Sequence, residues 1–247
     1  GPLLLIIASW FFEDKGGLGY FFEQGLLTNY TINTVIIALG TAFFSLLIGV
    51  GSAFCVNLTN MPCRSLIGWL LMLPFAVPAY VAAIIYADLL DSAGPLQIFI
   101  REFWGVSYGD YWFPSIRSLT GSIFIFTITL YPYIYLAASN AFVSQPRHLV
   151  ETGQLLGLRK FALFYKIILP MARPMIIVGV ALVIMEALAD FGVVSLFGIT
   201  TYTTGIYRAW QGNYDPFAAG QMASLLLAFI LVILWFEKYS RRQARYA

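Results

Sequence analysis

Glu186 and Asp190 stand out because they are carboxylates inside a long apolar stretch. They are four residues apart, so on a helix they share one face. An ionised carboxylate in such a stretch is costly unless it lines an aqueous cavity or has a partner. Two hard oxygen ligands on the wall of a passage would suit a hard, highly charged cation. The structural alternative is that Glu186 hydrogen-bonds to another helix and Asp190 lies at a membrane interface.

The composition indicates that these residues lie in an all-α polytopic membrane protein. Of the 247 residues, 60% are hydrophobic and only 11% charged, whereas soluble domains have about 25% charged residues. The apolar runs approach the roughly 20 residues that cross a bilayer as a helix, and alternating segments typical of a barrel are absent. We expect about six transmembrane helices in one domain, 1–247, with its core at 28–236. The expected spans are Pro2–Phe12, Ile32–Leu58, Leu66–Leu90, Leu119–Phe142, Met171–Val194 and Phe217–Phe236.

Proline and glycine are expected to shape three of these spans. Pro74 and Pro78 in the third span and Pro132 in the fourth free backbone carbonyls, which either line a path or shape packing. In the second span, Gly40, Gly49 and Gly51 are expected to allow close helix contacts.

The distribution of charge predicts the orientation of the chain. Basic residues gather in alternate connections and in the tail, and basic loops stay on the cytoplasmic side. They are Arg64, then Arg147, Arg159, Lys160 and Lys166, then Lys238, Arg241, Arg242 and Arg245. Both ends of the chain are therefore expected in the cytoplasm. The aromatic loop Arg101–Arg117 is expected outside, either as an interfacial belt or re-entrant helix or as a docking surface.

Segment 144–170 is too polar to span and is bounded by Pro146 and Pro170. Gly153 and Gly157 leave one stripe of it without side chains, which permits close backbone approach. Apolar residues at helical spacing form the other face, namely Leu149, Val150, Leu155, Leu156, Phe161 and Phe164. The pattern predicts a short cytoplasmic helix-turn-helix that lies on the membrane or fits a groove of a partner.

This segment resembles the cytoplasmic signature of the inner-membrane permeases of binding-protein-dependent ABC importers. That signature is Glu-Ala-Ala, three residues, Gly, nine residues, Ile, one residue, Leu-Pro. Glu151, Gly157, Ile167, Leu169 and Pro170 fall on its fixed positions, while Thr152 and Gly153 replace the two alanines.

The resemblance implies a type I ABC importer (MetI-like) permease fold in the bacterial inner membrane. It implies that segment 144–170, through its matched residues and the substitutes Thr152 and Gly153, fits a cleft of a cytoplasmic ATPase dimer. ATP and Mg would then be bound by that partner, and this chain would have no cofactor and no catalytic residue. The other implied partners are a periplasmic substrate-binding protein, a second permease half or copy, and membrane lipid, with no nucleic acid.

A narrower resemblance is carried by the Glu-x-x-x-Asp-Phe-Gly run at Glu186–Gly192 and the Thr-Thr-x-Ile-Tyr-Arg-x-Trp run at Thr203–Trp210. Both look like the ferric iron permeases, which implies iron delivered by a periplasmic protein and the first half of a fused two-half chain. Polyamine and thiamine permeases are similar alternatives. Because the sequence starts inside an apolar run without methionine, we expect it to be part of a longer chain.

Two other classes of function stay open. The sequence has no G-x-x-x-x-G-K-[ST] loop, so an ATP-driven transporter would need another polypeptide as its ATPase. A secondary transporter would use Glu186 and Asp190 as a proton relay and need no ATPase. A membrane scaffold would only dock a partner and would tolerate neutralisation of Glu186.

Overall fold

The computed structural model describes residues 9–11, 19, 21, 25–146, 153, 155 and 157–244, and all regular structure within them is helical. The predicted all-α class is therefore confirmed. The elements are α3 (Leu26–Leu58), α4 (Arg64–Leu70), the 3-10 turn η1 (Leu73–Ala76), α5 (Ala79–Leu90), α6 (Pro95–Trp104), α7 (Leu119–Val143), α9 (Lys160–Leu163), the π-helical turn η2 (Phe164–Ile168), α10 (Leu169–Ala189), α11 (Gly192–Leu196), α12 (Tyr202–Tyr207), the π-helical turn η3 (Arg208–Gly212) and α13 (Pro216–Ala244).

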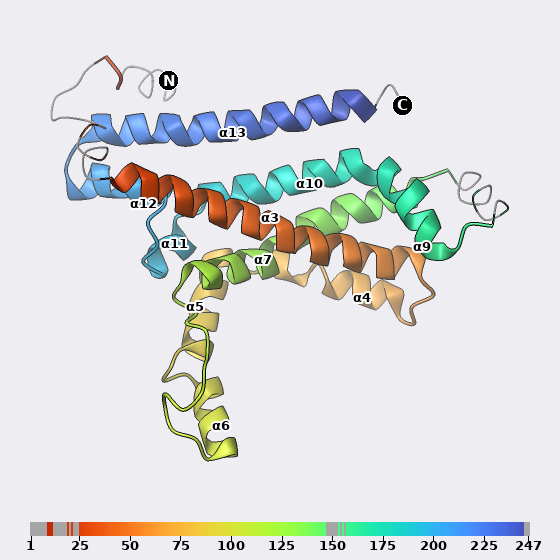
Figure 1. Ribbon diagram of the computed structural model, residues 1–247, viewed down its shortest axis with the longest axis horizontal. Coiled ribbons are helices and arrows are strands. Elements are labelled where there is room, and N and C mark those ends of the chain that lie inside the picture. The colour runs from red at the N-terminus through yellow and green to blue at the C-terminus, as the bar shows by residue number, and fades with distance from the viewer. Residues whose placement is uncertain are drawn as a thin grey trace.

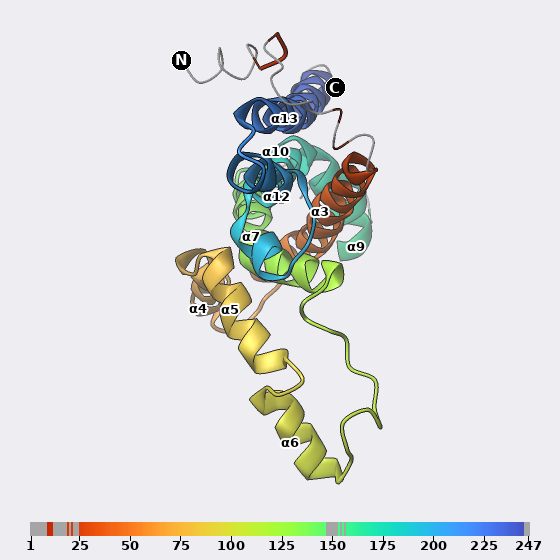
Figure 2. The ribbon, with the colours of Figure 1, turned by 90° about the vertical axis from the view of Figure 1, so that its left-hand side faces the viewer.

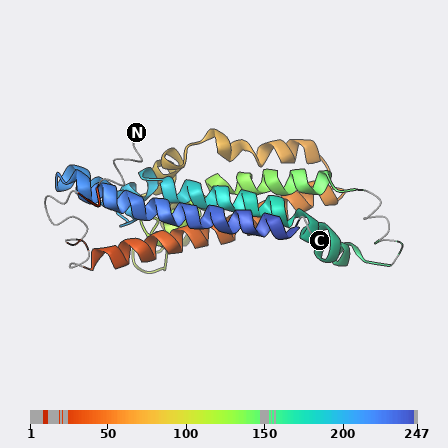
Figure 3. The same cartoon turned by 90° about the horizontal axis from the view of Figure 1, so that it is seen from above.

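Helices α3, α7, α10 and α13 run along the long axis of the molecule and form its bundle (Figure 1; Figure 3). The most extensive packing is between α3 and α7, and α10 packs on both. Ile134 of α7 is fully buried at the centre of this core. A Cβ added at Gly49 would lie 2.9 Å from Ile134 Cβ, and one at Gly179 would lie 3.1 Å from Ile134 Cα. These two glycines therefore let α3 and α10 approach the backbone of α7.

The expectation for glycines in the second span is met in part. A Cβ at Gly40 would come 2.8 Å from Ile123 Cδ1, so Gly40, like Gly49, is a close-contact position. Gly51 is not, because a Cβ added there would meet nothing within 4 Å. Gly51 lies on an open surface of α3.

Five segments of the described part of the chain are long and apolar enough to cross a membrane. They are Leu26–Leu58, Ala79–Trp104, Leu119–Val143, Phe161–Ala189 and Pro216–Tyr239. The first expected span, Pro2–Phe12, lies almost wholly outside the described residues. The fifth begins at Phe161 rather than Met171 and ends at Ala189 rather than Val194, because Asp190 caps its end with extended backbone.

The third span was wrongly predicted as one helix over Leu66–Leu90. The chain forms α4, then η1 with Pro74 in its first turn, and then α5 after Pro78, whose backbone is extended. Proline has no N–H and disfavours helix in the residue before it, so two prolines four apart break the span. The Tyr131 hydroxyl donates a hydrogen bond of 2.9 Å to the carbonyl of Leu71, which pairs a backbone group left free at the break.

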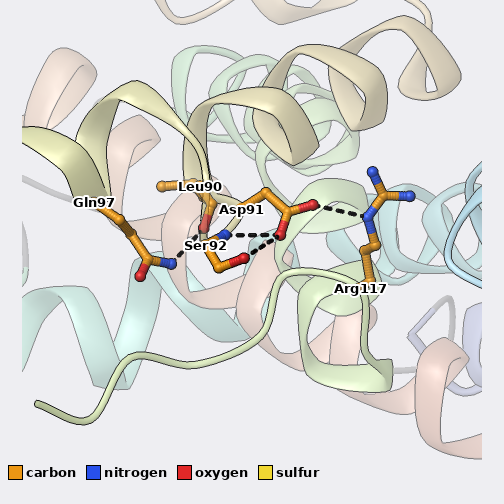
Figure 4. Close-up of polar contacts among 5 residues, drawn as sticks. All are labelled: Leu90, Asp91, Ser92, Gln97 and Arg117. Atoms are coloured by element: carbon orange, nitrogen blue, oxygen red, sulfur yellow. Dashed lines mark hydrogen bonds and ion pairs between the residues drawn. The ribbon is translucent and has the colours of Figure 1, made fainter. Parts of the chain in front are cut away.

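After this break, α5 and α6 leave the bundle sideways as an arm (Figure 2). The Asp91 carboxylate accepts hydrogen bonds from the Ser92 N–H at 2.7 Å and from Arg117 Nε at 3.1 Å. Gln97 Nε2 donates to the carbonyl of Leu90 at 2.9 Å (Figure 4). These contacts join the returning loop to the α5–α6 junction. The arm exposes the aromatic residues Phe99, Phe103, Trp104, Tyr108 and Trp112, as both an interfacial belt and a docking surface require.

The connections that the sequence places on one side of the membrane lie at one end of the bundle. The turn between α3 and α4, the α9 region and the end of α13 are at this end, and α11 and α12 are at the other (Figure 1). Helices α3, α7 and α13 run toward this end and α10 runs away from it, while α4, η1 and α5 return the chain between α3 and α7 (Figure 1).

Candidate functional site

Part of segment 144–170 is described, and its two glycines differ in role. Gly153 is buried, and a Cβ added there would lie 2.5 Å from Leu163 Cδ1 and 2.8 Å from Ile167 Cδ1. Gly157 has φ of 79°, and a Cβ there would meet nothing within 4 Å. Gly153 therefore allows the helical turn to pack on α9 and η2, whereas Gly157 supplies the left-handed backbone that reverses the chain.

A backbone hydrogen bond closes this reversal. The Leu158 N–H donates to the carbonyl of Gly153 at 3.1 Å, five residues back, as in a helix that ends on a left-handed glycine. The described residues thus contain the turn of the expected helix-turn-helix and its second helical part, α9. Glu151 and Thr152, the acidic residue of the matched pattern and its neighbour, lie outside the described residues.

The second half of the segment continues into α10 instead of ending at Pro170. The Leu169 N–H donates to the carbonyl of Phe164, five residues back, so the π-helical turn η2 leads directly into α10. Pro170 is in the first turn of α10, where a missing N–H costs least. The boundary expected at Pro170, before the span Met171–Val194, is therefore wrong, because the bend lies earlier, between α9 and α10 (Figure 1).

A side chain that the sequence reasoning missed connects the two ends of the segment. Gln145 Nε2, just beyond α7, donates a hydrogen bond of 2.8 Å to the carbonyl of Ile168. Ile168 is buried, while Ile167 and Leu169 are half-buried. A lone amide before Pro146 carries no pattern from which this contact could have been predicted.

The apolar face predicted for the segment divides in two. Phe164 is buried and packs edge-on against Phe54 of α3, with ring centroids 4.7 Å apart. Leu155 and Phe161 are 88% and 69% exposed. Leu149, Val150 and Leu156 are outside the described residues. The exposed pair offers an apolar surface at this end of the bundle, beside the exposed Lys166 and Arg159.

Glu186 and Asp190 are found in different surroundings. Glu186 is exposed on α10, and the Tyr133 hydroxyl of α7 donates to its Oε1 at 3.5 Å. Tyr133 in turn packs edge-on against Phe75 of η1, at 4.7 Å between ring centroids. Asp190 Oδ1 accepts a hydrogen bond of 2.8 Å from the Val193 N–H and so begins α11.

The two carboxylates therefore have separate partners, one a phenol and one a backbone amide. Among the described residues, no group of three or more His, Cys, Asp and Glu side chains could hold a metal ion. Tyr133 was missed because a tyrosine next to Pro132 in an apolar run carries no functional pattern of its own. Tyr133 lies beside Glu186 because α7 packs on α10.

The residues just before the Thr203–Trp210 run, Thr200 and Tyr202, attach this region to the start of α3. Asn33 Nδ2 donates to the carbonyl of Thr200 at 2.9 Å and lies 3.0 Å from its Oγ1. The Tyr202 hydroxyl is 2.8 Å from Thr31 Oγ1, and the Tyr202 N–H donates to Thr34 Oγ1 at 3.2 Å. A small pocket beside this junction is lined by Tyr30, Phe191, Ser195, Gly198, Ile199, Thr200, Thr204, Tyr207 and Arg208.

Comparison with known proteins identifies the family. Residues 45–246 match the family described as binding-protein-dependent transport system inner membrane component. The chain is 22% identical over 209 residues to the Fe(3+)-transport system permease protein FbpB 2 of Haemophilus influenzae, covering 85% of this chain and 37% of that relative's length. It is 29% identical over 209 residues to the sulfate transport system permease protein CysW of Escherichia coli, covering 83% of this chain and 69% of the relative.

Solved structures agree on the fold. A structure of the inward-facing MetNI methionine ABC transporter superposes with a TM-score of 0.72 at 16% identity, covering 90% of this chain and 97% of the other. A bacterial alginate ABC transporter in complex with its pentasaccharide-bound periplasmic protein superposes with a TM-score of 0.76 at 16% identity, covering 98% and 88%. The matched family model, the helical fold and the arrangement of the bundle lead to one conclusion. The chain belongs to the binding-protein-dependent inner membrane components, the permeases of ABC importers.

Proposed function

We propose that this chain is the transmembrane subunit of an ATP-driven importer and that segment 144–170 couples it to a separate cytoplasmic ATPase. The observation that carries the proposal is the glycine-built reversal at Gly153 and Gly157, which presents Leu155 and Phe161 to the outside. Exposed apolar residues on a short helix are the anchors that a groove on a partner protein recognises. Glu151, Thr152, Ile167, Leu169 and Pro170 belong to the same proposed coupling segment.

In this account the two bundle ends have different neighbours. The end with α9 and the α3–α4 turn faces the cytoplasm and the ATPase dimer, since it has the basic residues. The end with α11 and α12 faces a periplasmic substrate-binding protein. A second permease half or copy supplies the opposite wall of the passage, because Glu186 is exposed and Tyr133 only half-buried within the described part of the chain.

The test is uptake by the assembled importer in proteoliposomes, with the ATPase and the binding protein encoded beside this chain. Uptake is expected only with ATP on the ATPase side and the loaded binding protein on the other. Leu155→Asp is expected to release the ATPase from the purified complex, while Trp112→Asp, an equally exposed position on the arm, retains it. Uptake driven by a proton gradient without ATPase would instead support a secondary transporter that uses Glu186 and Asp190. A chain that binds partners without any uptake would be a scaffold.

Ferric iron is the cargo that we favour. Glu186 and Tyr133 place a carboxylate and a phenol within 3.5 Å of each other, and hard oxygen ligands suit a hard cation. The relative from Haemophilus influenzae is a permease for Fe(3+). A polyamine or thiamine, which are cations, would be compatible with the same carboxylate.

A tetrahedral oxyanion is a second candidate, favoured by a different observation. CysW, which is 29% identical to this chain, belongs to a sulfate transport system. The pocket beside α12 joins Arg208, two threonines and tyrosine hydroxyls, and a guanidinium suits an oxyanion. Parallel uptake assays with radiolabelled ferric iron, spermidine, thiamine, sulfate and molybdate, each with its loaded binding protein, distinguish these cargoes.

A further inference from the structure

A groove runs between α3 and the α9–α10 region, away from Glu186 and from the pocket at Arg208. Its volume is about 430 Å³. Almost all of its lining is apolar, contributed by Leu46, Leu47, Val50, Gly51 and Phe54 of α3 and by Phe161, Phe164, Tyr165, Leu169, Arg173, Ile176 and Ile177. Leu47, Phe161 and Tyr165 are more than half exposed, so the groove opens sideways on the bundle.

Arg173 is the charged residue of this lining. It is exposed and lies within the span Phe161–Ala189. Among the described residues, the single ion pair is between Arg117 and Asp91, and no hydrogen bond to the Arg173 guanidinium is found. A guanidinium inside a span is costly and is normally paired or reaches toward the interface. Arg173 therefore needs an anion from outside this part of the chain.

The length of the groove fits one leaflet of a bilayer. From Leu46 to Phe54 the helix α3 rises about 12 Å at 1.5 Å per residue, and half of the hydrocarbon core is about 15 Å. The Phe54 end is closed by Phe161, stacked at 6.0 Å between ring centroids. Lys166, which follows the lining residue Tyr165 in the chain, is exposed, so a positive charge lies near the end where lipid headgroups would lie.

We infer that this groove binds an anionic phospholipid, with an acyl chain between α3 and α10 and the phosphate on Arg173. The apolar lining matches an acyl chain, and a guanidinium binds phosphate through two parallel hydrogen bonds. Basic sites between helices at the cytoplasmic face are typical of anionic lipid binding. The inference goes beyond transport: it assigns a lipid site at the junction of the coupling segment with the bundle, where Phe164 packs on Phe54.

The test measures lipid binding by the assembled importer and does not depend on knowing the cargo. The complex is placed in nanodiscs of phosphatidylcholine with increasing phosphatidylglycerol, and the lipid retained after extraction is quantified by native mass spectrometry. Arg173→Gln is expected to weaken phosphatidylglycerol retention by about tenfold, the scale of one charge-assisted pair. Arg64→Gln, an exposed arginine at the same end of the bundle, is the matched control and should retain the lipid.

A second variant separates the groove from the charge. Gly51→Leu fills the groove without a clash in this chain, because a Cβ at Gly51 meets nothing within 4 Å. It is expected to exclude the lipid while Arg173 is kept. Equal retention in wild type, Arg173→Gln and Gly51→Leu would overturn the inference. Cross-linking from Gly51→Cys to another protein chain would also overturn it, since the groove would then be a contact between subunits.

Discussion

The turn at Gly157 offers a direct test of the coupling proposal. Its φ of 79° is in the left-handed region, where a residue with a Cβ loses about 1–2 kcal/mol relative to glycine. Because a Cβ there meets nothing within 4 Å, this backbone term is the whole local cost within the chain. Gly157→Val should therefore reduce the population of the reversed conformation by about 5- to 30-fold.

The assay is the ratio of cargo imported to ATP hydrolysed by the reconstituted importer. We expect this ratio to fall by a similar factor in Gly157→Val, while the chain still inserts in the membrane. Gly157→Asn is the control, because asparagine tolerates left-handed backbone, and it should stay close to wild type. If valine and asparagine gave the same ratio as glycine, the reversal at Gly157 would have no part in coupling.

Four further changes test other parts of the structure. Glu186→Gln should lower ferric iron uptake by about tenfold, which corresponds to a loss of about 1.4 kcal/mol of ligand interaction, while assembly with the ATPase stays intact. The control, Glu102→Gln at an exposed position on α6, should have no effect. Equal uptake by the two variants would make Glu186 a packing residue. Asp190→Asn keeps an oxygen that can accept the hydrogen bond from the Val193 N–H. A loss of uptake in that variant would therefore show that transport needs the negative charge of Asp190, and a normal uptake rate would show that it does not. Asn33→Leu leaves the Thr200 carbonyl unpaired and should cost about 1–3 kcal/mol in the free energy of unfolding measured by detergent titration; no change would show that α12 is held by other contacts. The free, exposed Cys63 should react with a membrane-impermeant maleimide in inside-out vesicles and not in intact cells, with Cys63→Ser as the blank, and the reverse pattern would invert the proposed orientation.

The membrane class, the family and a turn within segment 144–170 could be predicted because each depends on local sequence. Long apolar runs specify spanning helices, and the spacing from Glu151 to Pro170 is a pattern within one segment. The left-handed backbone of Gly157 was not predicted: close approach was expected at both glycines and is found at Gly153 alone of the two.

The errors came from tertiary packing. Whether Pro74 and Pro78 kink a span or break it depends on a partner for the freed carbonyls, and the Tyr131 hydroxyl supplies one at Leu71 from another helix. The start of the fifth span was misplaced because Pro170 is normally a boundary, whereas the π-helical turn before it keeps the chain helical. The pairing of Glu186 with Tyr133, 53 residues apart, and the empty surface at Gly51 arise from how the helices pack, which no local pattern records.

The central claim is that the reversal in segment 144–170 seats against an ATPase, and a photo-cross-linker in place of Leu155 tests it most directly. In the assembled importer, we predict adducts to the ATPase subunit that change in yield when ATP is bound, and none to it from a cross-linker at Trp112. Adducts from Leu155 to lipid alone, at any nucleotide state, would contradict the account.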